Sequence, residues 1–232
     1  MKSVLLIGAS SSLGRSVSKT FYEAGNKIVG TYCKSPSSIL DFENMNSMFL
    51  DLSCERSIVE FGSNIQSKGY TFDLCIFLAG FLPGENIQNY ENKKIDQVMA
   101  INFSGFSKVY KYLEPLFNQN SQVIIVSSIS AQRGSYDPIY AASKGALISF
   151  MKSLSQVKPL KTRANIIAPG LLKNSSMYNE MEASRRTFHA EQTATGKLTN
   201  MEDLSKIILD LSEPHWSNVN GAVIQVNGGA YV

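Results

Sequence analysis

Short β-branched runs alternate along the chain with longer segments of helical periodicity. The predicted strands are Val4–Ile7, Lys27–Thr31, Ser47–Leu50, Leu74–Leu78, Gln122–Ser127, Arg163–Ile167 and Ala222–Val226. The predicted helices are Leu13–Glu23, Ile58–Ser67, roughly Asn92–Asn118, Ile139–Ser155 and Asn200–Leu211. Strands that alternate with helices in this way are typical of βαβ units around a parallel sheet. We therefore expect the α/β class, with helices on both faces of a mainly parallel sheet.

No linker, internal repeat or charge block divides the sequence, so we expect one domain over residues 1–232. The least regular region is Leu171–Thr199, which follows Pro169-Gly170 and is rich in polar residues. Long polar excursions in compact domains are commonly functional, and we predict a substrate lid at about residues 171–199. Pro115 should kink or shorten the last turns of the helix predicted at 92–118, because proline lacks the N–H that a helix interior needs.

Composition and charge narrow the class of protein. Hydrophobic residues make up 44% of the chain and charged residues 18%, as in ordinary soluble globular proteins. The net charge of +3 is small and no segment concentrates it, which argues against nucleic acid as a partner. No apolar run is long enough to span a membrane. Three widely spaced cysteines are typical of a cytoplasmic protein, and two histidines without ligand spacing argue against a metal site.

The first predicted strand ends in a glycine-bearing turn that leads into a helix. The turn reads Gly8-Ala9-Ser10-Ser11-Ser12-Leu13-Gly14-Arg15. Backbone N–H groups and the positive end of the helix dipole face an anion at such a turn, and the missing glycine side chains let a pyrophosphate approach. The turn therefore predicts a dinucleotide-phosphate site, although a plain βα turn can also carry two glycines.

Tyr140 and Lys144 stand four positions apart at the start of a predicted helix. They share one helix face, so that the phenol and the ammonium can point into one pocket. A nearby cation lowers the pKa of a tyrosine from about 10, which would allow acid–base work near neutral pH. Ser127 and Ser128 stand at the end of the fifth predicted strand, at the edge where open α/β sheets bind ligands.

Taken together, these stretches resemble the short-chain dehydrogenase/reductase family, and 3-oxoacyl-thioester reductases in particular. Gly8 and Gly14 match the outer glycines of the family's G-x-x-x-G-x-G loop, with Ser12 in place of the middle glycine. The other matching segments, in chain order, are Asp51-Leu52, Ala79-Gly80 with Leu78 in place of Asn, Asn102, Tyr140 to Lys144, Pro169-Gly170 with Asn174 in place of a threonine, and Val226 to Gly229. The resemblance implies a Rossmann-like, doubly wound, mainly parallel seven-stranded sheet with helices on both faces.

The resemblance also implies a catalytic set. Tyr140 would be the general acid/base, Lys144 would depress its pKa and hold the nicotinamide ribose, and Asn102 would support a proton relay from a distorted helix. A serine would bind the substrate oxygen beside the tyrosine. The local Ser-Ser-x-x-small pattern favours Ser128, which we choose, whereas the usual distance to the tyrosine favours Ser127 as the alternative.

The end of the second predicted strand favours NADP(H) over NAD(H). An Asp or Glu there would bind both ribose hydroxyls of NAD, and none is present between Gly30 and Ser35. Lys34, with Arg15 and Ser35 nearby in the expected fold, would instead neutralise the 2′-phosphate of NADP, unless Lys34 is a solvated loop lysine. The residues expected to bind the cofactor are Gly8, Ser10, Ser11, Ser12, Leu13, Gly14, Arg15, Lys34, Asp51, Leu52, Ala79, Gly80, Tyr140, Lys144, Pro169 and Gly170.

The implied function is an NADP(H)-dependent oxidoreductase that transfers hydride between the nicotinamide and a small-molecule carbonyl or alcohol substrate. The alternative is a non-catalytic NADP(H)-binding regulatory protein of the same fold, for which the departures at Ser12, Leu78 and Asn174 leave room. The family further implies a homo-oligomer, either a tetramer or a dimer, that packs through the fourth and fifth helices.

Substrate choice would depend on the lid and on Tyr136, Pro138 and Ile139, which stand next to the tyrosine. Basic side chains in the lid could meet an anionic group, or could belong to an ordinary solvated helix; these are Arg185, Arg186 and His189. A 3-oxoacyl thioester, a sugar ketone and a polyketide ketone all remain open as substrates.

Overall fold

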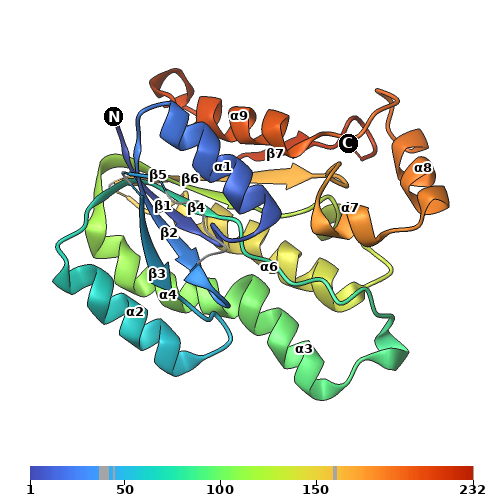
Figure 1. The fold of residues 1–232 in the computed structure, drawn as a ribbon, viewed down its shortest axis with the longest axis horizontal. Coiled ribbons are helices and arrows are strands. Elements are labelled where there is room, and N and C mark those ends of the chain that lie inside the picture. Colours follow the sequence, from blue (N-terminus) through green and yellow to red (C-terminus); the bar gives the residue numbers. More distant parts are fainter. Residues whose placement is uncertain (37–41, 44, 159–160, 232) are drawn as a thin grey trace.

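The computed structural model describes residues 1–36, 42–43, 45–158 and 161–231. Within these residues, seven strands form one sheet in which every pairing is parallel, in the order β3-β2-β1-β4-β5-β6-β7 (Figure 1). The strands are β1 (Ser3–Ile7), β2 (Lys27–Tyr32), β3 (Met45–Phe49), β4 (Phe72–Phe77), β5 (Phe117–Val126), β6 (Thr162–Pro169) and β7 (Val223–Val226). The predicted seven-stranded, doubly wound sheet is confirmed, and it is parallel throughout.

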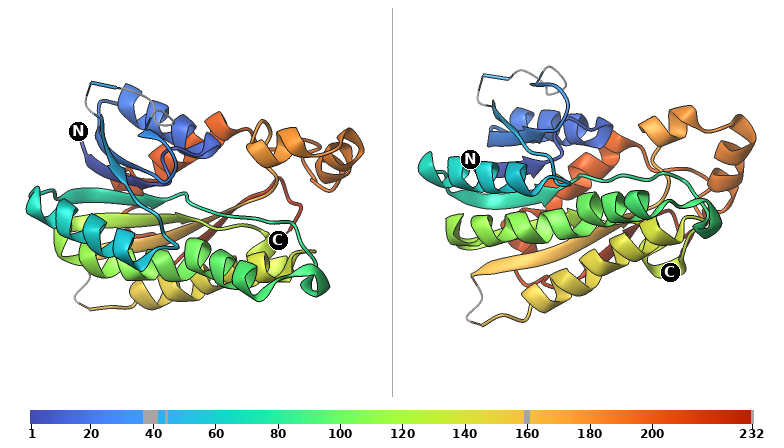
Figure 2. Two further views of the ribbon diagram at one scale, coloured as in Figure 1. Left: turned by 60° about the horizontal axis from the view of Figure 1, so that its bottom comes forward. Right: turned by 90° about the horizontal axis from the view of Figure 1, so that it is seen from below.

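Helices cover both faces of this sheet (Figures 1 and 2). The helices are α1 (Ser12–Glu23), α2 (Glu55–Ser67), α3 (Asn92–Met99), α4 (Gly105–Leu113), α5 (Ser130–Arg133), α6 (Pro138–Leu154), α7 (Ser176–Glu180), α8 (Ala183–Glu191) and α9 (Met201–Leu211). Helices α1 and α9 pack together on one face, while α2, α4 and α6 pack on the other.

Alternate residues of the central strands supply two separate hydrophobic cores. Cys75 and Phe77 of β4 belong to the core beneath α2, α4 and α6, whereas Leu74 and Ile76 belong to the core beneath α1 and α9. All four side chains are at most 1% exposed. A parallel strand buried on both faces needs a continuous apolar run, which is why these strands were visible in the sequence.

The helix predicted from Asn92 to Asn118 is wrong in its extent. The chain instead forms α3, a π-helical segment (Ala100–Ser104), α4 and a short 3-10 turn (Glu114–Leu116), and β5 already begins at Phe117. Pro115 stands in the first positions of the 3-10 turn, as expected for a residue that cannot continue the hydrogen bonding of an α-helix. Phe117 is 3% exposed and pairs with Phe72 of β4, so burial in the sheet overrides the helical pattern there.

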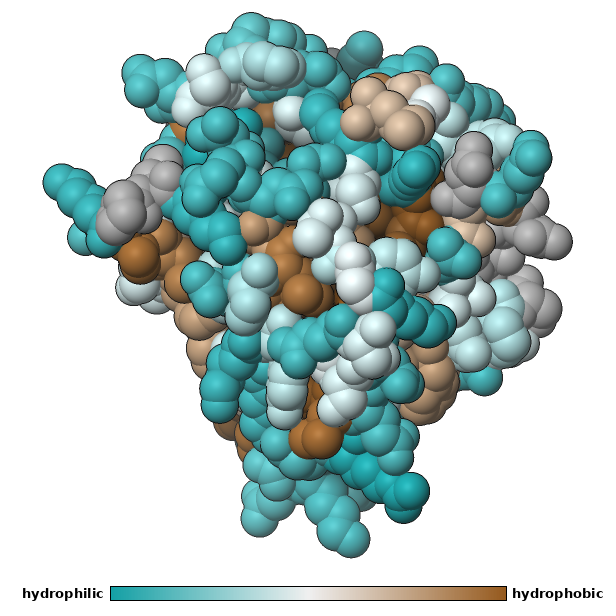
Figure 3. Space-filling view, turned by 90° about the vertical axis from the view of Figure 1, so that its left-hand side faces the viewer, coloured by the Kyte–Doolittle hydropathy of each residue, from teal (hydrophilic) through white to brown (hydrophobic). Residues whose placement is uncertain are grey.

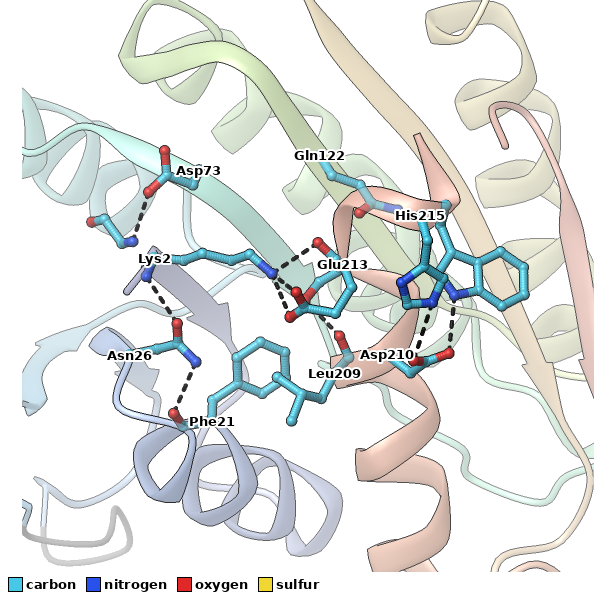
Figure 4. Close-up of polar contacts among 12 residues, drawn as sticks. Lys2, Phe21, Asn26, Asp73, Gln122, Leu209, Asp210, Glu213 and His215 are labelled. Carbon is cyan, nitrogen blue, oxygen red and sulfur yellow. Dashed lines mark hydrogen bonds and ion pairs between the residues drawn. The ribbon is translucent and has the colours of Figure 1, made fainter. Parts of the chain in front are cut away.

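The amino edge of the sheet is closed by polar contacts (Figure 4). The Lys2 ammonium donates to the Ser212 carbonyl at 2.9 Å and pairs with the Glu213 carboxylate at 2.7 Å, at the end of α9. The Lys2 backbone N–H donates to the Asn26 side chain at 2.9 Å, and the Ser3 N–H donates to Asp73 at 2.8 Å. These contacts join β1 to α9, β2 and β4 away from the carboxyl edge.

The face shown in Figure 3 is mainly hydrophilic, and its hydrophobic residues lie in small separate groups. Within the described residues, no helix is long and apolar enough to cross a membrane. The feature that bears on function is the carboxyl edge of the sheet. From β1 the chain runs outward to β2 and β3, and it then crosses back to β4 on the other side of β1. The carboxyl ends of β1 and β4 therefore flank the point where open α/β sheets bind ligands.

Candidate active site

The turn after β1 requires glycine at two positions. Gly8 has φ +94°, and a Cβ there would lie 2.7 Å from the Ala79 backbone nitrogen, because the ends of β1 and β4 meet at this point. A Cβ on Gly14 would lie 2.2 Å from the Gly8 carbonyl oxygen. The turn can close against β4 and α1 only without these side chains, and the backbone is left open to a ligand above it.

The helix start supplies donors to that open backbone. The Ser11 hydroxyl caps α1 by accepting the Gly14 N–H at 2.9 Å. The N–H groups of Ser12 and Leu13 belong to the first turn, where no helical carbonyl can accept them. A helix N-terminus behind a glycine turn fits a dinucleotide pyrophosphate. The cofactor role of the loop residues stays a prediction.

Ser12, which replaces the family's middle glycine, contacts the lid segment (residues 171–199). Its hydroxyl lies 3.0 Å from the hydroxyl of Ser176 at the start of α7. Arg15 is exposed, and its guanidinium donates to the Ser10 carbonyl at 2.9 Å. The substitution therefore joins the glycine turn to the lid instead of blocking the turn.

The end of β2 carries no carboxylate. Thr31 is buried, and its hydroxyl accepts the Gly8 N–H at 3.0 Å, so β2 supports the turn after β1 directly. Lys34 follows β2 and is exposed. Because β1 and β2 are neighbours, Lys34 and Arg15 both stand at the carboxyl edge where the predicted 2′-phosphate would lie.

Asp51 and Leu52 differ in which of their atoms a cofactor could contact. The Asp51 carboxylate accepts two hydrogen bonds from Ser53, one from the backbone N–H at 2.9 Å and one from the hydroxyl at 2.6 Å. Leu52 is 7% exposed and packs in the core under α2 and α4. Of this pair, Asp51 presents its side chain at the edge, whereas Leu52 offers only its backbone to a ligand.

The segment after β4 is anchored to β1. The N–H groups of Leu78 and Ala79 both donate to the Ile7 carbonyl, at 2.8 and 3.1 Å. Leu78, which replaces the family's Asn, is 8% exposed and packs in the core beneath α1 and α9. Apolar packing therefore takes the place of a polar contact here, and Gly80 follows beside Lys144.

Helix α6 delivers Tyr140 and Lys144 to the same edge, as predicted. Lys144 is 3% exposed, and its ammonium donates to the Val126 carbonyl at 3.2 Å and the Ala79 carbonyl at 3.5 Å. The Lys144 nitrogen lies 6.0 Å from the centre of the half-buried Tyr140 ring. The two side chains thus lie next to each other, with the lysine tied to the ends of β4 and β5.

The expected depression of the Tyr140 pKa is wrong, because the pKa of the phenol is raised. Burial raises the pKa of the phenol, the hydrogen bond with the Ser128 hydroxyl lowers it less, and the Asp137 carboxylate raises it further. Burial also lowers the pKa of Lys144 to about 8. The lysine does not impose phenolate on Tyr140, because its own charge is disfavoured by burial and it bonds to carbonyl oxygens.

The two candidate serines occupy different environments. The Ser127 hydroxyl is buried and donates to the Lys144 carbonyl at 2.9 Å, which joins β5 to α6. The Ser128 hydroxyl is half-buried, accepts the Ser130 N–H at 3.1 Å and is hydrogen-bonded to the Tyr140 phenol. The geometry favours Ser128 as the hydroxyl that would meet a substrate oxygen beside Tyr140.

Asn102 lies inside the π-helical segment, in keeping with the main-chain distortion expected there. Its side chain is fully buried and its oxygen accepts the Phe81 N–H at 2.7 Å. Its amide donates to the Phe81 carbonyl and the Ser143 hydroxyl, both at 2.9 Å. Ser143 donates in turn to the Tyr140 carbonyl at 2.7 Å, so Asn102 reaches the tyrosine through one residue.

The remaining predicted cofactor positions close the far side of the site. The carbonyl of Pro169, at the end of β6, accepts the Ile129 N–H at 3.1 Å, next to Ser128. The Gly170 N–H donates to the Val226 carbonyl of β7 at 3.2 Å. Asn174, which replaces a threonine, has φ +65°, a left-handed conformation that Asn tolerates better than β-branched Thr.

The predicted lid segment forms α7 and α8 over this edge, as Figure 2 shows. A small pocket beneath it is lined by Ile129, Arg133, Gly170, Leu171 and His189, among others. Burial lowers the pKa of His189, and the charges of Arg133 and Arg185 lower it further.

The other predicted lid arginine, Arg186, is engaged within the lid. Its guanidinium donates to the Met181 carbonyl at 2.7 Å and stacks over Tyr178 at 4.8 Å. Of the three predicted substrate positions beside the tyrosine, Tyr136 is 65% exposed and its hydroxyl accepts from Asn86 at 3.0 Å. Pro138 and Ile139 form the first positions of α6.

Asp137 is a residue that the sequence analysis missed. It caps α6, with its carboxylate accepting the Tyr140 N–H at 2.8 Å. The signal was present, because Asp followed by Pro138 is a typical N-cap and first position of a helix. Among the described residues, no group of three His, Cys, Asp or Glu side chains could hold a metal ion.

Comparison with known proteins shows the family to which the chain belongs. A family model described as "Enoyl-(Acyl carrier protein) reductase" matches residues 8–231. A "3-oxoacyl-[acyl-carrier-protein] reductase FabG" of Buchnera aphidicola is 26% identical over 240 residues, covering 100% of this chain and 98% of the relative. A solved Brucella melitensis structure, "Short-chain dehydrogenase/reductase SDR:Glucose/ribitol dehydrogenase", superposes with a TM-score of 0.91 at 25% identity, covering 100% of this chain and 97% of that one.

A short-chain dehydrogenase from Burkholderia cenocepacia, solved "in complex with NADP", has a TM-score of 0.87 at 18% identity, covering 98% of this chain and 96% of that one. At that identity the likeness shows the fold alone. The chain belongs to the short-chain dehydrogenase/reductase family and is an oxidoreductase.

We expect the buried ammonium of Lys144 to make stability depend on pH. Its pKa is about 8 when folded and 10.5 when unfolded, so between these values the unfolded chain binds the additional proton. The free energy of unfolding should therefore rise from pH 8 to pH 10.5, by about 3 kcal/mol relative to Lys144→Met. Urea denaturation of both proteins across this range measures the difference, and parallel pH profiles would contradict a buried, destabilised ammonium.

Proposed function

We propose that the protein reduces a ketone to an alcohol with NADPH, and that Tyr140 donates the proton. The observation that carries this proposal is the Tyr140 phenol, hydrogen-bonded to Ser128 and beside Lys144, at the carboxyl edge of a parallel sheet. A raised pKa keeps the phenol protonated at neutral pH. Tyr140 is then a general acid, as the reductive direction requires.

The glycine turn, the Ser12 and Leu13 N–H groups, Asp51 and Gly80 would hold the dinucleotide, with Pro169-Gly170 at its nicotinamide end. When bound, the reduced nicotinamide supplies the hydride that reaches the carbonyl carbon. Lys34 and Arg15 support NADP(H) over NAD(H), because both cations stand at the carboxyl edge of β1 and β2 and no Asp or Glu lies between Gly30 and Ser35. The NADP held by the Burkholderia relative is consistent with this preference.

Four side chains would take part in the reaction, two of them at the reacting oxygen. Ser128 hydrogen-bonds the carbonyl oxygen and positions it, and Tyr140 protonates that oxygen as negative charge develops on it. Lys144 lies one helical turn away and orients the ribose side of the pocket. Asn102 binds Ser143 and Phe81 near the tyrosine. It stands at the position that the family resemblance assigns to the proton relay.

The substrate class best supported is a 3-oxoacyl thioester. The Buchnera relative bears the name of a 3-oxoacyl-[acyl-carrier-protein] reductase. The lid carries the apolar side chains that an acyl chain would contact, since Met177 and Phe188 are 40% and 55% exposed. Exposed apolar side chains within the otherwise polar lid suit an acyl ketone better than a sugar ketone.

We also propose a cytoplasmic homo-oligomer, a tetramer or dimer, that packs through α4 and α6. Phe103, Tyr110 and Phe150 form an aromatic cluster on this side of the molecule and remain only partly buried. Partly exposed aromatic side chains on two adjacent helices are suited to a contact between subunits.

Tyr140→Phe should abolish turnover while leaving NADPH binding intact. Loss of a positioned general acid costs about 10²–10⁴-fold in kcat, whereas the phenyl ring keeps its packing. NADPH oxidation with a 3-oxoacyl thioester measures kcat, and fluorescence titration measures the NADPH Kd. Turnover retained in Tyr140→Phe would refute the acid role, and tight NADPH binding without turnover by the wild type would favour the regulatory alternative.

The two serines should respond differently to removal of the hydroxyl. Ser128→Ala should lower kcat by about 10²-fold, as expected for a lost donor to a developing oxyanion. Ser127→Ala should change kcat little and lower stability by about 1 kcal/mol, because it loses only the contact with the Lys144 carbonyl. Steady-state kinetics and thermal denaturation of the pair check this, and the reverse ranking of kcat would assign the role to Ser127.

Lys34→Ala should raise the KM for NADPH about tenfold and leave that for NADH unchanged. The lost contact with a 2′-phosphate is worth about 1.4 kcal/mol, and NADH has no such group. Lys27→Ala is the matched control, since Lys27 is an exposed lysine at the opposite end of β2. Equal effects on the two cofactors would contradict the NADP(H) assignment.

A further inference from the structure

One buried carboxylate next to the site has no part in the proposed chemistry. Asp137 is 2% exposed, and it precedes α6 immediately. One of its oxygens accepts the Tyr90 hydroxyl at 2.7 Å and the Tyr140 N–H at 2.8 Å. The other accepts the N–H groups of Gly84 at 3.0 Å and Glu85 at 3.4 Å. An N-cap requires only the second of these four contacts.

The other three contacts all reach one segment, residues 81–91, that runs from the end of β4 to α3. Asn102 holds the start of the same segment through both backbone groups of Phe81, and holds α6 through Ser143. Asp137 holds its middle and its end. The segment is thus tied at two places to the two turns of α6 that carry Tyr140 and Lys144.

We propose that Asp137 is a positioning residue: it holds the first turn of α6, which carries Tyr140, against the 81–91 segment, and this segment forms one wall of the substrate site. This rests on the proposed function, because a wall matters only where a substrate binds. Tyr136 supports the placement, since its hydroxyl accepts from Asn86 of the same segment at 3.0 Å.

The charge of Asp137 acts on the same tyrosine. The titratable groups around Tyr140 are Asp137 before α6, Lys144 one turn along it, and Tyr90 on the facing segment, where Glu85 also acts on Tyr90. The Asp137 carboxylate raises the pKa of Tyr140, so removing this charge should lower that pKa. The acid form of Tyr140 would then be lost at lower pH.

The test separates the effect of the Asp137 charge from the effect of its hydrogen bonds to the 81–91 segment. Asp137→Asn keeps an oxygen for Tyr140 and Tyr90, but its amide cannot accept from Gly84 and Glu85. We expect kcat to fall about tenfold, the KM for the ketone to rise, and the alkaline limb of the kcat profile to move to lower pH. Tyr90→Phe keeps the charge, and it should raise the KM severalfold without moving that limb.

Two further measurements make the outcome decisive. Asp73→Asn is the matched control, because Asp73 also joins two segments, Ser3 and Asn118, but at the amino edge. The Tyr140 pKa is read by NMR of ζ-¹³C-labelled tyrosine, with the signal assigned by its loss in Tyr140→Phe. If the wild type reduces no ketone, the proposed function fails while this titration still tests Asp137.

A lowered Tyr140 pKa in Asp137→Asn, with a raised KM in Tyr90→Phe, supports the positioning role. The proposal is overturned if Asp137→Asn and Tyr90→Phe lose stability no differently from Asp73→Asn while kcat, KM and the Tyr140 pKa stay at wild-type values. Should Asp137→Asn fail to fold, Tyr90→Phe decides alone, through the KM for the ketone.

Discussion

The site depends on a buried ammonium that bonds to the ends of two strands. Lys144 reaches from α6 to the carbonyls of Val126 on β5 and Ala79 beyond β4, and it is 3% exposed. Parallel strands end with carbonyl oxygens that the sheet itself no longer uses, and these can hold a buried cation without a carboxylate partner. This contact ties α6 to the ends of two strands, and Tyr140, Ser143 and the Asn102 network lie on or against the same turns of α6.

Much of the fold could be predicted because its strands are buried on both faces. Continuous apolar runs such as the one through Cys75 mark such strands directly, and the seven predicted strands all form. The long helix at 92–118 failed because periodicity does not reveal a π-helical segment or the point where Phe117 joins the sheet. Tertiary burial decides both, and a local pattern does not contain it.

The site was predicted unevenly for a similar reason. Motif order placed Tyr140, Lys144 and the glycine turn at one edge, since the chain direction of parallel strands determines that edge. The choice between Ser127 and Ser128 depends on a one-residue register, and the sequence does not contain the contacts that distinguish the two hydroxyls, such as the one between Ser127 and the Lys144 carbonyl. The direction of the Tyr140 pKa depends on burial, and Asp137 gained its importance from a segment about 50 residues earlier in the chain.

The departures from the family pattern have structural explanations in this chain. Leu78 packs into the core, Asn174 adopts a left-handed conformation, and Ser12 reaches the lid through Ser176. None of the three removes a group that the proposed chemistry needs. The Ser12 contact is particular in that it joins the cofactor turn to the segment expected to cover the substrate.

The most direct measurement follows the hydrogen itself. NADPH deuterated at C4 on one face is incubated with the protein and a 3-oxoacyl thioester, and the alcohol product is analysed by mass spectrometry and NMR. The experiment is repeated with NADPH deuterated on the opposite face of C4. If the site transfers hydride as proposed, one of these two labelled cofactors places a single deuterium on the carbinol carbon and the other places none. Binding of NADPH with no deuterated alcohol from any ketone tested would contradict the assignment as a reductase.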